Sequence, residues 1–234
     1  MNLHQRIHQV LAQRGYQVRQ HPAARRQQLF AAKGVDLVLD VGAAVGAYGT
    51  ELRGFGYHGR IVSFEPLSNA YAALLRVSDR DPGWVAIRTA LGEDDGETDI
   101  NVAGNSDSSS LLPMLEAHRS AAPHANYVGV ETIQVHKLDD VAAEYTARSH
   151  QQFLKIDTQG FERQVLAGAT KTMPSVVGLQ IELSFVPLYE GSMLAHEAIS
   201  DLHEQGFLLE GLETGLRDPV TGQMLQADGL FFRQ

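Results

Sequence analysis

The sequence of 234 residues predicts an α/β fold with a doubly wound, mostly parallel sheet. First, short apolar runs alternate with stretches of helical periodicity, which is the pattern of βαβ units with right-handed crossovers. Second, these runs are apolar on both faces, as strands covered by helices on each side must be. Third, a glycine-bearing turn joins the first run to a helix, as in many doubly wound folds.

Each expected element follows from this pattern. The sheet strands are expected at Val35–Asp40, Arg60–Glu65, Trp84–Ala90, Phe153–Asp157 and Val177–Leu183. The helices between them are expected at Tyr48–Gly54, Asn69–Ser78, Leu138–Arg148, Glu162–Ala167 and Ala195–Gln205. Near the end, the turn residues RDPVTG (217–222) separate Phe207–Leu212 from Leu230–Phe232, so an antiparallel C-terminal hairpin should close one edge. The segment Gly104–Asn126 is long and rich in small residues, and is either a mobile lid or a surface excursion.

Charge divides the chain into two expected parts, a basic helical N-terminal segment (1–34) and a single domain (35–234). Residues 1–35 hold six basic and no acidic residues, whereas the remainder holds 13 basic and 28 acidic ones. Such a basic segment either makes a peripheral contact with an anionic membrane, or docks on an acidic substrate, or lies on its own acidic domain.

The composition excludes several classes of protein. The net charge of −9 argues against a nucleic-acid partner, because phosphate contacts need a basic face. Without cysteine there is no disulfide framework and no thiolate nucleophile or metal ligand. The apolar runs are too short to span a bilayer, and the N-terminus lacks the apolar core of a signal peptide. We therefore expect a cytoplasmic protein. The oligomeric state is not predicted.

The turn after the first strand, DVGAAVG (40–46), indicates a cofactor site. A strand, a glycine-bearing turn and a helix together bring a nucleotide-like cofactor against backbone N–H groups, here those around Gly42, Ala43 and Gly46. In a dinucleotide fingerprint the second glycine admits the pyrophosphate, but Ala44 stands there. The carboxylate of Asp40 would also repel phosphates. S-adenosylmethionine carries an ammonium and a sulfonium and no phosphate, so this acidic loop favours it.

Two further strand ends complete the expected cofactor site. Glu65 ends the second strand before Pro66, where an acid can accept hydrogen bonds from both ribose hydroxyls. The alternative is an ordinary exposed strand-end acid. Thr89 and Ala90 end the third strand, where backbone groups can meet an adenine edge.

From Asp36 onward the chain resembles the FkbM family of class I methyltransferases. The segments that carry the resemblance are DVGAAVG (40–46), VSFEP (62–66), TALGEDDGE (89–97), KLDD (137–140), LKIDTQGFERQVLAGA (154–169), QIELS (180–184) and TGQMLQADGLFFR (221–233). The resemblance implies methyl transfer from S-adenosylmethionine to a hydroxyl of a sugar, glycolipid or polyketide-type acceptor. Two departures are visible: Ala44 replaces a common asparagine, and Thr158 and Gln159 stand where an acid is common.

The expected catalytic residues lie at the carboxyl ends of the fourth and fifth strands, where ligands gather in open α/β sheets. An alcohol is a poor nucleophile, so a nearby base is expected. Asp157 either orients or deprotonates the acceptor, or caps the next helix. Lys155 either neutralises the charge that develops in the reaction or pairs with Asp157 or Glu182. Glu182, if it is buried, needs a catalytic role or an ion pair to offset the cost of burying its charge. His136 is either a base or a surface residue. No metal is expected, because Asp139 and Asp140 are explained as acids at a helix start.

Other functions are compared with this one. An NAD-dependent oxidoreductase is disfavoured by Ala44 and Asp40. A non-catalytic methyltransferase-like binding module is disfavoured by the presence of Asp157 and Glu182 beside an intact loop. Nucleic-acid or protein methylation is disfavoured because DTQG (157–160) stands where amino-methylating enzymes often carry an Asn-Pro-Pro-Tyr-type motif.

Overall fold

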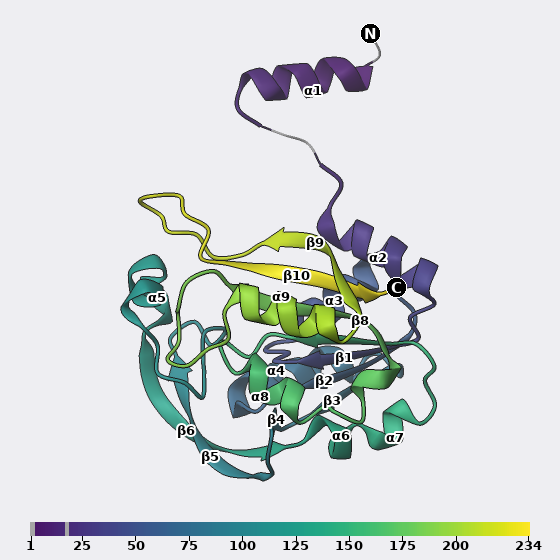
Figure 1. Cartoon of the computed structure of the whole chain (residues 1–234), viewed down its shortest axis with the longest axis vertical. Helices are drawn as coiled ribbons and strands as arrows, with labels where there is room; N and C mark the ends of the chain where they lie inside the picture. The colour runs from purple at the N-terminus through teal and green to yellow at the C-terminus, as the bar shows by residue number, and fades with distance from the viewer. Residues whose placement is uncertain (1–2, 17–18) are drawn as a thin grey trace.

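The structure, a computed structural model, describes residues 3–16 and 19–234. A seven-stranded sheet runs through it in the order β3-β2-β1-β7-β8-β10-β9 (Figure 1). In that order the strands are Trp84–Ile87, Arg60–Phe64, Leu37–Val41, Gln152–Ile156, Val176–Ser184, Gln226–Arg233 and Phe207–Thr214. The first five pair in parallel, and β10 is antiparallel to both of its neighbours. The predicted mostly parallel sheet with an antiparallel C-terminal edge is confirmed.

Helices cover both faces of this sheet, and each face has its own apolar core. On one face, Phe30 of α2 (Pro22–Lys33), Leu52 of α3 (Ala47–Gly54) and Leu74 of α4 (Ser68–Ser78) pack on alternate strand residues such as Val38 and Phe153. On the other face, α6 (Leu138–Val141), α8 (Glu162–Ala167) and α9 (Ala195–Glu204) pack on the strand residues of opposite parity. This arrangement is why the strands read as apolar on both faces.

A second, three-stranded sheet was not predicted. It has the order β4-β6-β5 and consists of β4 (Ala90–Leu91), β6 (Tyr127–His136) and β5 (Gly96–Ala103). Most of β5 and β6 is exposed on at least one face, so polar and apolar residues mix and the strand pattern is weak. The expected third strand Trp84–Ala90 is accordingly split, because β3 ends at Ile87 and Ala90 belongs to this second sheet.

The segment Gly104–Asn126 connects β5 to β6. It contains α5 (Glu116–Ala121) and a 3₁₀ turn (Pro123–Ala125). Met114 forms a β-bridge with Tyr189, and both are buried in one apolar cluster. The middle and end of the segment are therefore fastened to the domain, and the turn that begins it reaches the cavity described below.

Two other expectations change in detail. The helix expected over Leu138–Arg148 consists of two short helices, α6 and α7 (Ala143–Thr146). The expected boundary between residues 34 and 35 does not mark the edge of the core, because Phe30 is 1% exposed and packs at a tilt against Phe153, with ring centroids 4.5 Å apart.

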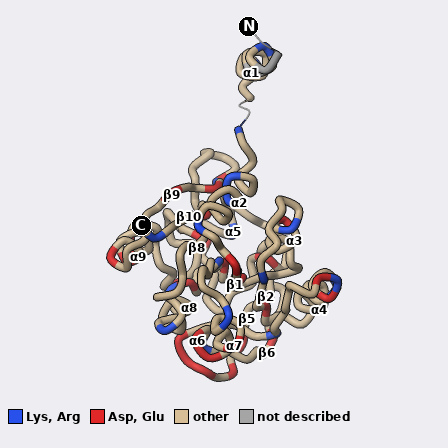
Figure 2. Tube along the Cα trace, turned by 90° about the vertical axis from the view of Figure 1, so that its right-hand side faces the viewer, with Lys and Arg blue, Asp and Glu red and all other residues tan. Residues whose placement is uncertain are grey.

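Helix α1 (Leu3–Gln13) lies apart from the rest of the chain (Figure 1). It exposes Ile7 and Val10, and its sequence contains one arginine, Arg6, and no acidic residue (Figure 2). Among the described residues, no helix is both long and apolar enough to cross a membrane.

Candidate active site

A cavity of about 430 Å³ opens at the carboxyl ends of the parallel strands, where such folds bind their ligands. Its volume lies within the range of small-molecule sites. Of the twelve residues predicted for the site, eight line this cavity: Gly42, Ala43, Glu65, Pro66, Thr89, Ala90, Lys155 and Asp157. The other four, Asp40, Gly46, Glu182 and His136, lie behind or away from its surface, as described below.

The glycine loop forms one wall because its backbone adopts left-handed conformations. Gly42 has φ of 74°, and a Cβ there would lie 1.8 Å from the carbonyl oxygen of Asp157, so only glycine fits. Ala44 also has positive φ, 46°, which is costly for a residue with a side chain. This conformation directs the Ala44 N–H to the carboxylate of Glu65 at 2.9 Å. Gly46, with φ of 84°, precedes α3 and packs behind the wall against α4.

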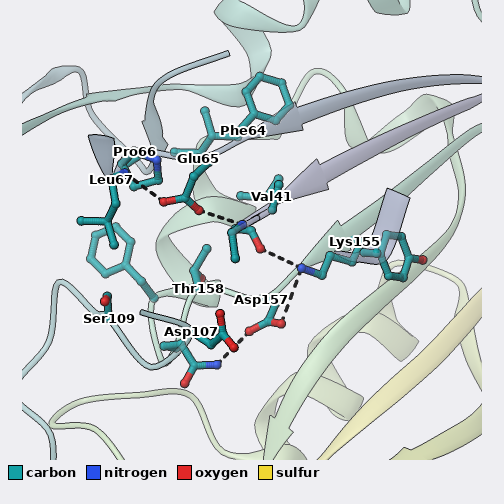
Figure 3. A pocket seen from close by; sticks show the side chains of 18 of the residues that line it. Val41, Phe64, Glu65, Pro66, Leu67, Asp107, Ser109, Lys155, Asp157 and Thr158 are labelled. Carbon is teal, nitrogen blue, oxygen red and sulfur yellow. Dashed lines mark hydrogen bonds and ion pairs between the residues drawn. The ribbon is translucent and has the colours of Figure 1, made fainter. Parts of the chain in front are cut away.

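Glu65 is buried beside the loop and holds the cavity wall together. One carboxylate oxygen accepts the N–H of Ala44 and the other accepts the N–H of Leu67, each at 2.9 Å (Figure 3). Burial raises its pKa to about 7, although both hydrogen bonds and the nearby Lys155 oppose that rise. A carboxylate oxygen has further lone pairs, so each can also accept a ligand hydroxyl.

Apolar side chains line the cavity around the ends of β2 and β4. Leu67, Leu91, Ile100, Leu111 and Phe161 surround Thr89 and Ala90 there. The Thr89 hydroxyl is turned to the carbonyl oxygen of Ala90, at 2.8 Å. This part of the cavity suits a flat aromatic ring with few charged contacts.

A row of polar residues crosses the otherwise apolar sheet. Register places Ser63, Asp40, Lys155 and Gln180 side by side on β2, β1, β7 and β8. Asp40 is fully buried; its carboxylate accepts the Ser63 hydroxyl at 2.9 Å and lies 3.4 Å from the Lys155 ammonium. Asp40 therefore acts on the cavity through Lys155 and does not line it.

Lys155 connects this buried row to the cavity. Its Nζ donates to the carbonyl oxygen of Gly42 at 2.9 Å and lies 3.5 Å from the carboxylate of Asp157. Burial alone would lower the pKa of Lys155, but the charges of Asp157 and Asp40 raise it above its usual value. Lys155 thus links the glycine loop to Asp157, and of the two partners expected for an ion pair the structure places Asp157 beside it.

Asp157 follows β7 and faces the cavity, with 36% of its side chain exposed. Its second oxygen accepts the side-chain N–H of Gln159 at 2.8 Å. Gln159 also donates to both oxygens of Glu182, at 3.2 and 3.1 Å. An acid at position 159 would repel both carboxylates, whereas this amide bridges them. The presence of Gln159 where the family commonly has an acid therefore has an electrostatic reason.

Glu182 lies behind Gln159 and pairs across the strands with Asp228 of β10. Burial raises the pKa of Glu182 well above its usual value, and the charges of Asp157, Glu162 and Asp228 add to that rise. Asp228 lines the cavity, and burial together with the charge of Asp157 raises its pKa to about 7. Asp157 is consequently the carboxylate best placed to meet a ligand.

Two further acids, Glu162 and Asp139, and the predicted His136 lie outside the cavity lining. Glu162 accepts the backbone N–H of Thr158 and of Gly160, each at 3.0 Å, so it holds the turn after Asp157. His136 ends β6 in the second sheet, is 41% exposed and lies 3.4 Å from Asp95. The structure does not bring it to the cavity lining, because β6 belongs to the second sheet and not to the main one. Asp139 is engaged by backbone N–H groups of the loop at 171–172.

Other residues of the cavity could not be found from the sequence. Asp107 comes from the turn that begins the segment Gly104–Asn126, and its side chain points toward Asp157 (Figure 3). Burial and the charge of Asp157 raise the pKa of Asp107, while Lys155 lowers it. Tyr48, Glu51 and Asp228 also line the cavity. Tyr48 and Glu51 stand in no motif, and Asp228 lies in the segment 221–233 but was not predicted for the site; tertiary packing brings the three together.

The charge of the lining tests which cofactor fits. Among the described residues that line the cavity, the acids are Glu51, Glu65, Asp107, Asp157 and Asp228, and Lys155 is the single cation. Lys155 is already engaged by two carboxylates. A pyrophosphate would find no free cation in this lining, whereas the sulfonium and ammonium of S-adenosylmethionine would meet a favourable field. The residues present therefore fit S-adenosylmethionine.

The sequence model of the methyltransferase FkbM domain matches residues 40–209. The chain belongs to this family. It is accordingly an α/β methyltransferase whose cofactor is S-adenosylmethionine, and the resemblance expected from the sequence is confirmed. Membership in this family decides against the NAD-dependent oxidoreductase.

Solved structures similar to this chain share little sequence with it. Fibrillarin from Aeropyrum pernix, crystallised with natively bound S-adenosyl-L-methionine, is 12% identical over 89% of this chain and 75% of that chain, with a TM-score of 0.44. TehB from Haemophilus influenzae is 10% identical over 92% of this chain and 63% of that chain, with a TM-score of 0.48. No curated protein sequence matches significantly.

Proposed function

We propose that this methyltransferase acts on a hydroxyl oxygen of a sugar, glycolipid or polyketide-type acceptor. The observation that carries the proposal is the position of Asp157, a carboxylate that faces the cavity and is fixed by Lys155 on one side and Gln159 on the other. A hydroxyl that donates to this carboxylate is held and oriented, and it has a group to receive its proton.

S-adenosylmethionine supplies an electrophilic methyl group. The protein has to present a nucleophile to it, and an alcohol, with a pKa near that of water at about 15.7, is weak without a base. Asp157 can take that proton, whereas the raised pKa of Glu182 keeps that carboxyl from ionising readily. Lys155 keeps Asp157 in place and offsets the negative field around it. We propose that Glu65 accepts the ribose hydroxyls of the cofactor.

The acceptor class follows from the same charges. Asp107 and Asp157 lie close together at the cavity, so an acceptor with a carboxylate or phosphate near its reacting hydroxyl would be repelled. A neutral acceptor with neighbouring hydroxyls instead offers donors to both carboxylates. This supports a sugar or a polyhydroxylated polyketide.

The test is transfer of a trideuteromethyl group from labelled S-adenosylmethionine to four probes: a neutral methyl glycoside, a glycolipid extract, a macrolide alcohol and a peptide. Mass spectrometry and fragmentation should find the label as an ether in one of the first three. Asp157→Asn should lose the transfer, and Asp79→Asn, which changes an exposed acid outside the cavity lining, should keep it. Label found on nitrogen, or on none of the probes, would contradict the proposal.

A contact between α1 and an anionic membrane is a separate proposal. It rests on Arg6 and the exposed Ile7 and Val10 of that helix, and on Arg14 directly after it. Part of the basic segment serves the domain itself, since Lys33 donates to the carbonyl oxygen of Arg233 at 3.0 Å. Co-sedimentation with phosphatidylserine vesicles tests the contact, and equal recovery with neutral phosphatidylcholine vesicles would contradict it.

A further inference from the structure

Helix α2 carries two adjacent arginines that do different things. Arg25 is exposed and donates to the carbonyl oxygen of Glu210 on β9, at 2.5 Å. Arg26 is 1% exposed and turns into the domain. There its guanidinium donates to the carboxylate of Glu213 at 3.0 and 3.1 Å, to the side-chain oxygen of Gln180 at 3.2 Å, and to the carboxylate of Glu51.

Two of the three side chains that accept hydrogen bonds from Arg26 line the cavity, and the third, Glu213, does not. Glu51 of α3 and Gln180 of β8 both line it, and so does Tyr48, whose ring lies under the guanidinium with 4.7 Å from Cζ to the ring centroid. Tyr48 also donates to Gln180 at 3.3 Å. Arg26 does not line the cavity, so it stands directly behind this wall and bonds to both elements that build it.

Burying this guanidinium is expensive. Charges are removed from water at a cost that ion pairs repay only in part, so a buried ion pair is weak evidence of stabilisation. Within the described residues the Nε of Arg26 also has no hydrogen-bond acceptor. An apolar side chain would fill the same space at a lower free-energy cost of burial. The arginine is the residue that can hold a carboxylate, an amide and an aromatic ring from two other elements at once.

The family match begins at residue 40, so α2 lies outside it. We propose that Arg26 is a positioning residue for the methyl-donor site: it holds Tyr48, Glu51 and Gln180 in the arrangement that S-adenosylmethionine binds, and α2 thereby forms part of that site. This inference rests on the proposal that the cavity holds the donor. When the side chains of the wall are already ordered, binding does not have to order them, so the loss of Arg26 should lower the affinity for the ligand.

The experiment is calorimetric titration of full-length variants with S-adenosylhomocysteine, well below their melting temperatures. Arg26→Met should weaken binding about tenfold, the effect of losing one hydrogen bond to a charged group. Arg25→Met is the matched control, because it also unties α2 from β9 but touches no cavity residue. It should bind as the wild type does. Arg26→Lys, which keeps the charge but not the fork of donors, should fall between.

A second measurement separates positioning from a loss of stability. If Arg26 acts through Glu51, then Glu51→Gln should weaken binding in the wild type but add little in the Arg26→Met background. Additive losses, or equal weakening by Arg25→Met and Arg26→Met, would show a merely structural role. If Arg26→Met melts too low to titrate, Arg26→Lys decides alone. Wild-type affinity in both Arg26 variants would overturn the inference, and no binding to the wild type would overturn the donor site with it.

Discussion

Glu65→Gln is the substitution that probes the donor site most simply. The carboxylate accepts two backbone N–H groups, from Ala44 and Leu67. Glutamine has the same shape but one oxygen, so its amide N–H must face one of those N–H groups. The ribose of the cofactor also loses one acceptor. We expect the affinity for S-adenosylhomocysteine to fall by about 1–3 kcal/mol, the range for leaving a buried polar group unpaired.

The pKa of Glu65 adds a pH dependence with a definite sign. Burial raises this pKa from 4.5 to about 7 in the ligand-free protein, so folding favours the protonated form. The corresponding stability, about 3 kcal/mol, is present below pH 4.5 and is lost as the pH rises through about 7. Binding has the opposite sign, because only the carboxylate accepts both ribose hydroxyls. Affinity should therefore be about tenfold higher at pH 8 than at pH 6.

Calorimetry at several pH values measures both effects. Asp228 also lines the cavity with a pKa of about 7, so the difference between wild type and Glu65→Gln isolates Glu65. The wild-type profile should rise through pH 7, and the part due to Glu65 should be absent from the variant. Equal affinity of the two proteins, or identical pH profiles, would refute the reasoning that places the ribose on Glu65.

Three further predictions follow from the same geometry. Asp157→Asn should lower single-turnover methyl transfer about a hundredfold or more while leaving S-adenosylhomocysteine binding nearly unchanged, and near-wild-type turnover would remove Asp157 from the catalytic residues. Ala44→Asn should raise the melting temperature by about 1–3 °C, because asparagine tolerates the left-handed backbone that alanine holds here; a lower temperature in a melting scan would contradict this. Hydrogen exchange in residues 104–109 should slow when cofactor and acceptor are both bound. Residues 110–126 should change little, because Ser110 and Met114 are already bonded to the rest of the domain. If exchange in residues 104–109 is the same with and without the ligands, the turn is an ordinary surface loop.

The central strands of the main sheet could be predicted because they are buried on both faces, so Leu37–Val41 and Gln152–Ile156 stand out as apolar runs. Glu65 and Asp157 could be predicted for a related reason. Each follows a buried strand directly, and parallel strands bring their carboxyl ends to one edge of the sheet. Position along the strand therefore sufficed for both residues.

The remaining parts depend on tertiary packing that no local pattern records. Strands β5 and β6 mix polar and apolar residues because much of their surface meets solvent, so the period-two signal is weak. The sequence does not distinguish Arg26 from the other five basic residues of 1–35, because only tertiary packing buries it. Asp228 lies on β10, the antiparallel strand between β8 and β9, and its register places it opposite Glu182. His136 has the chemistry of a base, but it ends β6 of the second sheet and therefore lies outside the cavity.

The most direct test of the central claim is a crystal structure of the protein with S-adenosylhomocysteine. The claim is that the cavity between the glycine loop and Asp157 holds the methyl donor. We expect the ribose hydroxyls within hydrogen-bond distance of Glu65, the adenine among Leu67, Ile100 and Phe161, and the sulfur on the side that faces Asp157. Ligand bound outside this cavity, or a ribose turned away from Glu65, would contradict the account.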